Sequence, residues 1–161
     1  MKLLNIIIAI LTTVLLSLVI FTRDPIGFIN EDIYYKMTAN ELIDVLGEPH
    51  EKTGVPNDHI VYYYDLMYEE ISGEASFTFY NDKLISIIFD SDDNSCDMQQ
   101  AVNIINEIKT KYKNKNYYEQ NEHIDENSYS ILFGQTNGAA GKDIVAEYKN
   151  GILSIKAELM E

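Results

Sequence analysis

An uncharged stretch of 19 residues, from Leu3 to Phe21, divides this 161-residue chain into two unlike parts. As a helix rising about 1.5 Å per residue, the stretch would span roughly 28 Å, close to the hydrocarbon thickness of a bilayer. Removable signal peptides usually have a shorter apolar region and a cleavage site of small residues, whereas large residues precede Arg23 here. Residues 1–23 are therefore predicted to form a transmembrane helix that acts as an uncleaved signal anchor, with cleavage as the alternative.

Charge at the two ends of this stretch predicts its orientation. Lys2 and the amino terminus lie on one side, and Arg23, offset by Asp24, lies on the other. Positive charge tends to stay in the cytoplasm, so the pattern predicts a single-pass protein of the bacterial cell membrane with an extracytoplasmic C-terminal domain. Residues 24–36 are predicted to be a linker, and residues 37–161 form the exported domain.

The chain beyond Arg23 is strongly acidic. Its 138 residues contain all 26 acidic residues and 10 of the 12 basic ones, which gives a net charge of −16. Such a charge repels nucleic acid, and it either attracts a basic protein or divalent cations or keeps the domain soluble. Cys96 is the only cysteine, so the chain has no intrachain disulfide.

The segment 37–90 is predicted to contain one helix followed by three antiparallel strands. Thr38 and Glu41 have the spacing of a capping box at the start of the helix, and Gly47 followed by Pro49 ends it. The turn Asn81-Asp82 suits a tight hairpin. The predicted strands are 60–65, 75–80 and 84–89.

The segment 97–159 is predicted to have the same order. Asp97 and Gln100 have the capping-box spacing, and apolar residues recur at helical spacing as far as Lys113. Asn150-Gly151 is typical of a type I′ hairpin turn. The predicted strands are 129–133, 144–148 and 152–159. The predicted fold class is α+β: an N-terminal transmembrane helix and then a helix-plus-antiparallel-sheet domain, with two αβββ repeats as a hypothesis.

Residues 37–49 have the pattern M-T-x-x-E-x-x-x-x-L-G-x-P, and Tyr62-Tyr63-Tyr64 and the hairpin residues 77–84 follow them. This succession resembles the small exported domains of the BamE (SmpA/OmlA) type and is similar to the repeats of β-lactamase inhibitor protein. The resemblance covers about 37–90. It implies a non-enzymatic module that binds another protein.

The sequence contains no strong signature of catalysis or metal binding. Residues 90–94 place oxygen ligands as in a calcium loop, but Ala101 replaces its bidentate Glu. Gly141-Lys142 lacks the rest of a phosphate loop. His50, His59 and His123 are too scattered for a zinc signature. We therefore predict no catalytic residue, no cofactor, no metal and no small-molecule substrate.

Tyrosine is unusually frequent, with 12 residues against no tryptophan. Tyrosine is favoured at protein interfaces because it is large, rigid and amphipathic. The outward-facing members of a tyrosine set are the predicted contact surface: Tyr62, Tyr63, Tyr64 and Tyr68. The chain is thus predicted to be a membrane-anchored, extracytoplasmic, non-enzymatic protein-binding module. The alternatives are an immunity or inhibitor protein that neutralises a basic toxin or enzyme, and a cation-dependent hydrolase.

Overall fold

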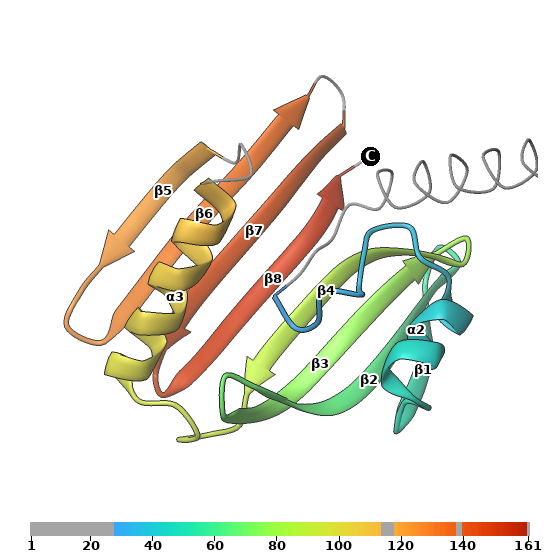
Figure 1. Cartoon of the computed structure of the whole chain (residues 1–161), viewed down its shortest axis with the longest axis horizontal. Coiled ribbons are helices and arrows are strands. Elements are labelled where there is room, and N and C mark those ends of the chain that lie inside the picture. The colour runs from blue at the N-terminus through green and yellow to red at the C-terminus, as the bar shows by residue number, and fades with distance from the viewer. Residues whose placement is uncertain (1–27, 114–117, 138–139, 161) are drawn as a thin grey trace, which may run out of the picture.

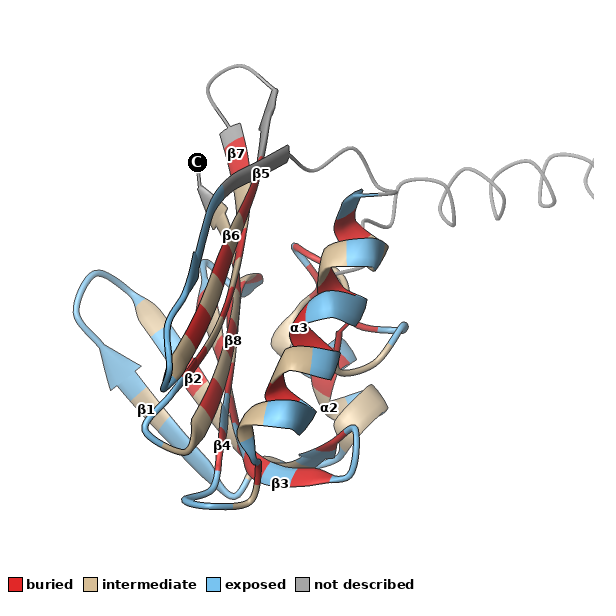
Figure 2. Cartoon of the chain, turned by 90° about the vertical axis from the view of Figure 1, so that its left-hand side faces the viewer, coloured by how far each residue is buried: buried red, intermediate tan, exposed pale blue. Residues whose placement is uncertain are grey.

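The computed structural model describes residues 28–113, 118–137 and 140–160. Eight antiparallel strands form one sheet, and two helices lie on the same face of it (Figures 1 and 2). The elements of the first half are α2 (Ala39–Leu46), β1 (Glu51–Val55), β2 (His59–Tyr68), β3 (Ile71–Tyr80) and β4 (Lys83–Ser91). Those of the second half are α3 (Met98–Lys113), β5 (Tyr118–Ile124), β6 (Ser128–Asn137), β7 (Ala140–Lys149) and β8 (Ile152–Met160).

The strand order is β1-β2-β3-β4-β8-β7-β6-β5. Each half is a meander of four strands that begins at an edge of the sheet and ends at its centre. The halves therefore meet where β4 pairs with β8, with Phe89 opposite Ile155. At this seam the amide of Leu153 donates to Oγ of the buried Ser91 over 2.9 Å.

Local signals fix both helix starts as predicted. Thr38 and Glu41 form a full capping box, and the amide of Gly47, which has φ 85°, donates to the carbonyl of Ile43. Asp97 and Gln100 exchange the equivalent hydrogen bonds, at 2.8 and 3.0 Å, at the start of α3. These side chains satisfy amides of the first turn that have no partner inside the helix.

Residues with positive φ make the tight turns. Asn81 and Asp82 join β3 to β4, and Asn150 and Gly151 join β7 to β8, with φ between 49° and 87°. Asparagine, aspartate and glycine adopt these angles at least cost, which confirms both predicted hairpins. Between β2 and β3, however, the turn consists of Glu69 and Glu70, whose φ values are 48° and 67°.

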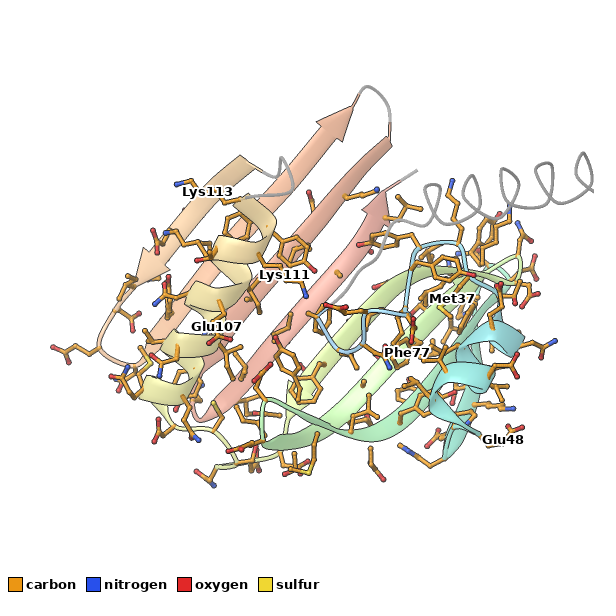
Figure 3. All side chains as sticks on the ribbon, viewed as in Figure 1. Met37, Glu48, Phe77, Glu107, Lys111 and Lys113 are labelled. Atoms are coloured by element: carbon orange, nitrogen blue, oxygen red, sulfur yellow. The ribbon has the colours of Figure 1, made fainter. Side chains whose placement is uncertain are left out.

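The core lies between the sheet and the helices. Phe77 of β3 is fully buried and belongs to the same core cluster as Met37 (Figure 3). In the second half, α3 packs on β6 and β7 and buries Ile105 and Tyr112. Every second residue of β3 is buried, from Ile71 to Phe79, as expected for a strand with one covered face.

Residues 28–36, predicted to be a linker, contribute to this core. Phe28, Ile33 and Tyr35 are at most 6% exposed. The amide of Lys36 donates to the carbonyl of Leu84, and the amide of Leu84 donates to the carbonyl of Met37. The segment thus passes over the helix-covered side of the sheet near the seam (Figure 1).

The predicted fold class is wrong in two respects. Each half has four strands instead of three, because polar edge strands β1 and β5 complete the sheet. Within the described ranges, neither helix has the length and apolar composition needed to cross a bilayer. The predicted transmembrane anchor, 1–23, lies outside the described residues. The single-pass membrane localisation predicted from it is therefore corrected: the structure gives it no support.

Candidate functional site

The face of the sheet opposite α2 and α3 is the candidate site, and we call it the open face. In the part of the chain that the structure describes, no helix covers this face (Figure 2). Successive side chains of a strand point to opposite faces, so the residues that alternate with the buried ones belong to the open face. The strand register then shows which of these residues lie side by side.

A row of half-buried side chains crosses the middle of the open face. Tyr63, Ile88 and Val145 belong to it, and each is directly opposite the next member on the neighbouring strand. We call it the central row: Tyr63, Ser76, Ile88, Lys156, Val145 and Leu132. All six are half-buried, and four of them are apolar or aromatic.

Acidic residues dominate the next row. Asp65 is opposite Glu74, and Glu74 is opposite Asp90. We call it the acidic row: Asp65, Glu74, Asp90, Ser154, Glu147, Ser130 and His123. Its three carboxylates on β2, β3 and β4 are exposed. The open face therefore has an apolar middle with negative charge along one side.

Of the four predicted tyrosines, only Tyr63 belongs to the open face. Tyr62, Tyr64 and Tyr68 lie on the helix-covered face of β2, where Tyr64 and Tyr68 are buried and Tyr62 is half-buried. The contact surface was predicted to consist of the outward-facing tyrosines of this set. Tyr63 is therefore the one predicted tyrosine that remains a candidate for this surface. Among the tyrosines whose burial is described, six, including Tyr112 and Tyr129, are core residues.

The buried tyrosines have structural roles. The Tyr64 hydroxyl donates to the carbonyl of Gly47 over 3.1 Å and so completes the end of α2. Burial, with a contribution from the Glu48 carboxylate, raises the pKa of Tyr64 to about 12. Tyr68 meets Phe28 and Phe89 edge to face, and burial raises its pKa as well. Both side chains are neutral over the physiological range.

Two groups that could carry chemistry, the Cys96 thiol and the Asp82 carboxylate, are enclosed or engaged by the fold. Cys96 is 3% exposed, and burial raises the pKa of its thiol, which disfavours the reactive thiolate. A hollow beside Tyr62 is also lined by Ile60 and Phe79. The hollow has two carboxylates, Asp58 and Asp82, and that of Asp82 accepts a hydrogen bond from the amide of Ala39 at the start of α2.

One group of three potential metal ligands exists in the described ranges: His50, Asp65 and Glu74. The carboxylates of the acidic turn after β4, which resembled a calcium loop, do not form such a group among the described residues.

The other residues considered in the sequence have partners elsewhere. Lys142, which follows Gly141 as in part of a phosphate loop, lies in β7 with its ammonium 5.6 Å from the centre of the Tyr35 ring. His59 stacks on Tyr80, and His123 lies 3.4 Å from Asp125.

Sequence reasoning missed the central row and the acidic row because their members come from strands that are distant in the chain. For β3 alone, the alternation of Ser76 and Thr78 with Phe77 and Phe79 could have shown which residues belong to the open face. The β4–β8 pairing, which joins Ile88 to Lys156, had no local signal.

Comparison of this chain with known protein families, with curated proteins and with solved structures gives no match. The resemblance of residues 37–90 to the BamE and inhibitor-protein domains stays a prediction.

Proposed function

We propose that this chain is a non-enzymatic module that binds another protein through the open face of its sheet. The observation that carries the proposal is the central row, which lies on a face that none of the described helices covers. Four of its six side chains are apolar or aromatic, namely Tyr63, Ile88, Val145 and Leu132, and Ser76 and Lys156 lie between them. Protein interfaces commonly have an apolar or aromatic centre and a polar rim, and the acidic row supplies such a rim.

The open face also has the extent that a stable complex requires. Neighbouring strands are about 4.8 Å apart, so eight strands extend over roughly 34 Å. Residues that share a face are about 6.7 Å apart along a strand, and strands of nine or ten residues have at least four residues on each face. The central row, the acidic row and one further row together cover roughly 700 Å². A standard protein–protein interface uses about 800 Å² of each partner.

Charge indicates a basic partner. The acidic row brings Asp65, Glu74, Asp90 and Glu147 to one side of the central row, and the whole chain has a net charge of −14. A negative face steers a positive one during association and disfavours acidic competitors. The same face suits an inhibitor or immunity protein that masks a basic enzyme, which is the second candidate function.

The experiment is capture of the partner from an extract of the native cells with immobilised full-length chain. A variant of the central row, Tyr63→Ala with Ile88→Ala and Leu132→Ala, should lose the partner while the fold remains. The matched control is Gln99→Ala with Asn103→Ala, because these two exposed residues lie on α3, away from the open face. The control should capture as much partner as the unchanged chain.

Salt tests the role of charge. Association should slow from 0.01 M to 0.15 M salt, because the Debye length falls from about 30 Å to about 8 Å. Equal capture by the central-row variant and the control would contradict the proposal. For the inhibitor function, the captured partner should be an enzyme or toxin that loses activity on binding; a partner that stays fully active excludes it.

A further inference from the structure

The side chains of His50, Asp65 and Glu74 converge at one end of the open face from three separate segments of the chain. Asp65 of β2 and Glu74 of β3 are directly opposite each other across the strand pair. His50 lies between α2 and β1, and its amide donates to the carbonyl of Tyr63 over 3.0 Å, which fixes its backbone beside β2. The fold therefore holds one imidazole against two carboxylates.

The side chains of this His50 cluster are close enough to share an ion. Nδ1 of His50 lies 3.8 Å from an Asp65 oxygen, and Nε2 lies 3.4 Å from a Glu74 oxygen. One ligand atom from each residue can be chosen so that all three lie within 4.8 Å of one another. Zinc binds nitrogen and oxygen at about 2.0–2.2 Å, so its tetrahedral ligands are about 3.4 Å apart.

We propose that the His50 cluster is a binding site for a divalent transition-metal ion, with zinc as the preferred metal. The ligands need to close by roughly 1 Å to reach zinc geometry. They have room to do so, because the side chains of His50, Asp65 and Glu74 are 38%, 86% and 51% exposed.

Charge and ligand type both favour this assignment. Like charges directly opposite each other in a sheet are destabilising, and a divalent ion between Asp65 and Glu74 removes that repulsion. The neighbouring Asp90 adds to the negative potential that concentrates cations there. Imidazole suits zinc, whereas calcium and magnesium prefer sites made of oxygen alone. Three protein ligands leave a fourth position of the zinc ion to solvent.

The test is calorimetric titration of the full-length chain with zinc chloride, and separately with calcium chloride. We expect one zinc ion per chain and much weaker binding of calcium. His50→Ala should weaken zinc binding by at least about tenfold, since even the loss of an outer-shell partner typically has that effect. Glu74→Gln, which keeps the size of the side chain, should do the same.

The matched control is His123→Ala. His123 also has a carboxylate within reach, Asp125 at 3.4 Å, but no third ligand among the described residues. Its replacement should leave zinc affinity unchanged. Absence of zinc binding, equal binding of calcium and zinc, or equal losses in His50→Ala and His123→Ala would each overturn the site. Circular dichroism of every variant checks that a loss of affinity is not a loss of fold.

Discussion

α2 has 8 residues and buries one side chain, Leu42, whereas α3 has 16 residues and buries five. Each helix precedes a meander of four strands in the same sheet. The first half gains further buried side chains from the segment 28–37, in which Phe28, Ile33, Tyr35 and Met37 are buried. The comparison shows that a four-stranded meander can be covered by one long helix, or by a short helix together with an irregular segment that contains turns.

The two halves of the sheet differ at equivalent positions, counted from the β2–β3 turn in the first half and from the β6–β7 connection in the second. In the first half, Tyr64 pairs with Ala75, and at the equivalent positions of the second half Phe133 pairs with Ile144. Gly73 in β3 is at the position equivalent to Lys142 in β7. The first half has glycine there because the ring of Phe89 occupies the space of a side chain.

The largest expected effect tests whether the segment 28–37 contributes as much to stability in the first half as α3 does in the second. Ile33→Ala should lower the free energy of unfolding by about 3 kcal/mol, as much as Ile105→Ala in α3, because both remove a fully buried side chain. Urea unfolding of the two variants measures this. A loss below about 1 kcal/mol for Ile33→Ala would break the comparison.

Gly73 should be the least tolerant glycine of the first half. A Cβ atom there would clash with the carbonyl oxygen of Asp90 and would lie 2.7 Å from the Phe89 ring. Gly73→Ala should therefore cost about 2–3 kcal/mol by overpacking. Gly54→Ala is the control, since nothing lies within 4 Å of its added Cβ. Thermal unfolding should separate the two variants; similar melting temperatures would contradict the expected clash.

Tyr64→Phe makes the first half resemble the second. It should cost about 1 kcal/mol at neutral pH, because the carbonyl of Gly47 loses its donor. Since the folded pKa of Tyr64, about 12, lies above its ordinary value of 10.0, the tyrosine stabilises the fold below pH 10, and this contribution is lost as pH rises to 12. Stability measured from pH 8 to 12 should fall less steeply for the variant. Parallel curves would assign the alkaline loss to other groups.

The helix caps should contribute equally in the two halves. Thr38→Ala and Asp97→Ala should each cost about 1 kcal/mol, because each leaves an amide of the first turn without its side-chain acceptor. Chemical denaturation of both variants measures the losses. A much larger loss for Thr38→Ala would show that the short helix depends more heavily on its cap.

The smallest expected effect is a gain. Glu70→Gly should stabilise the chain by about 0.5 kcal/mol, because glycine adopts its φ of 67° without steric cost. The variant gives the β2–β3 turn the glycine that the β7–β8 turn has at Gly151. A fall in melting temperature would indicate that the Glu70 side chain makes a compensating contact.

Local signals predicted the parts of the fold that local interactions decide. Both capping boxes and the turns at Asn81 and Asn150 are satisfied within a few residues, so short windows of sequence contain them. The edge strand Glu51–Val55 was missed because it is exposed or half-buried throughout and carries charge and glycine. Charged residues suit an edge strand, where pairing with another chain must be avoided.

The candidate sites were mostly beyond prediction from sequence. The tyrosine-rich strand was found, but the face to which each ring points depends on which side the helices cover. The register that places Tyr63 beside Ser76 and Ile88 spans distant strands. The His50 cluster combines residues 50, 65 and 74, whose spacing matches no known zinc signature.

The seam between β4 and β8 has a consequence for the order of folding. Within each meander, strands pair across short turns, so their contacts close small loops at little entropic cost. The hydrogen bond from Leu153 to Ser91 instead joins residues that are 62 positions apart. Contacts of such separation slow folding, so we expect the two meanders to form first and the pairing of β4 with β8 to limit the rate of folding. Substitutions at Phe89 or Ile155 should then slow refolding, whereas those in the outer turns should mainly speed unfolding.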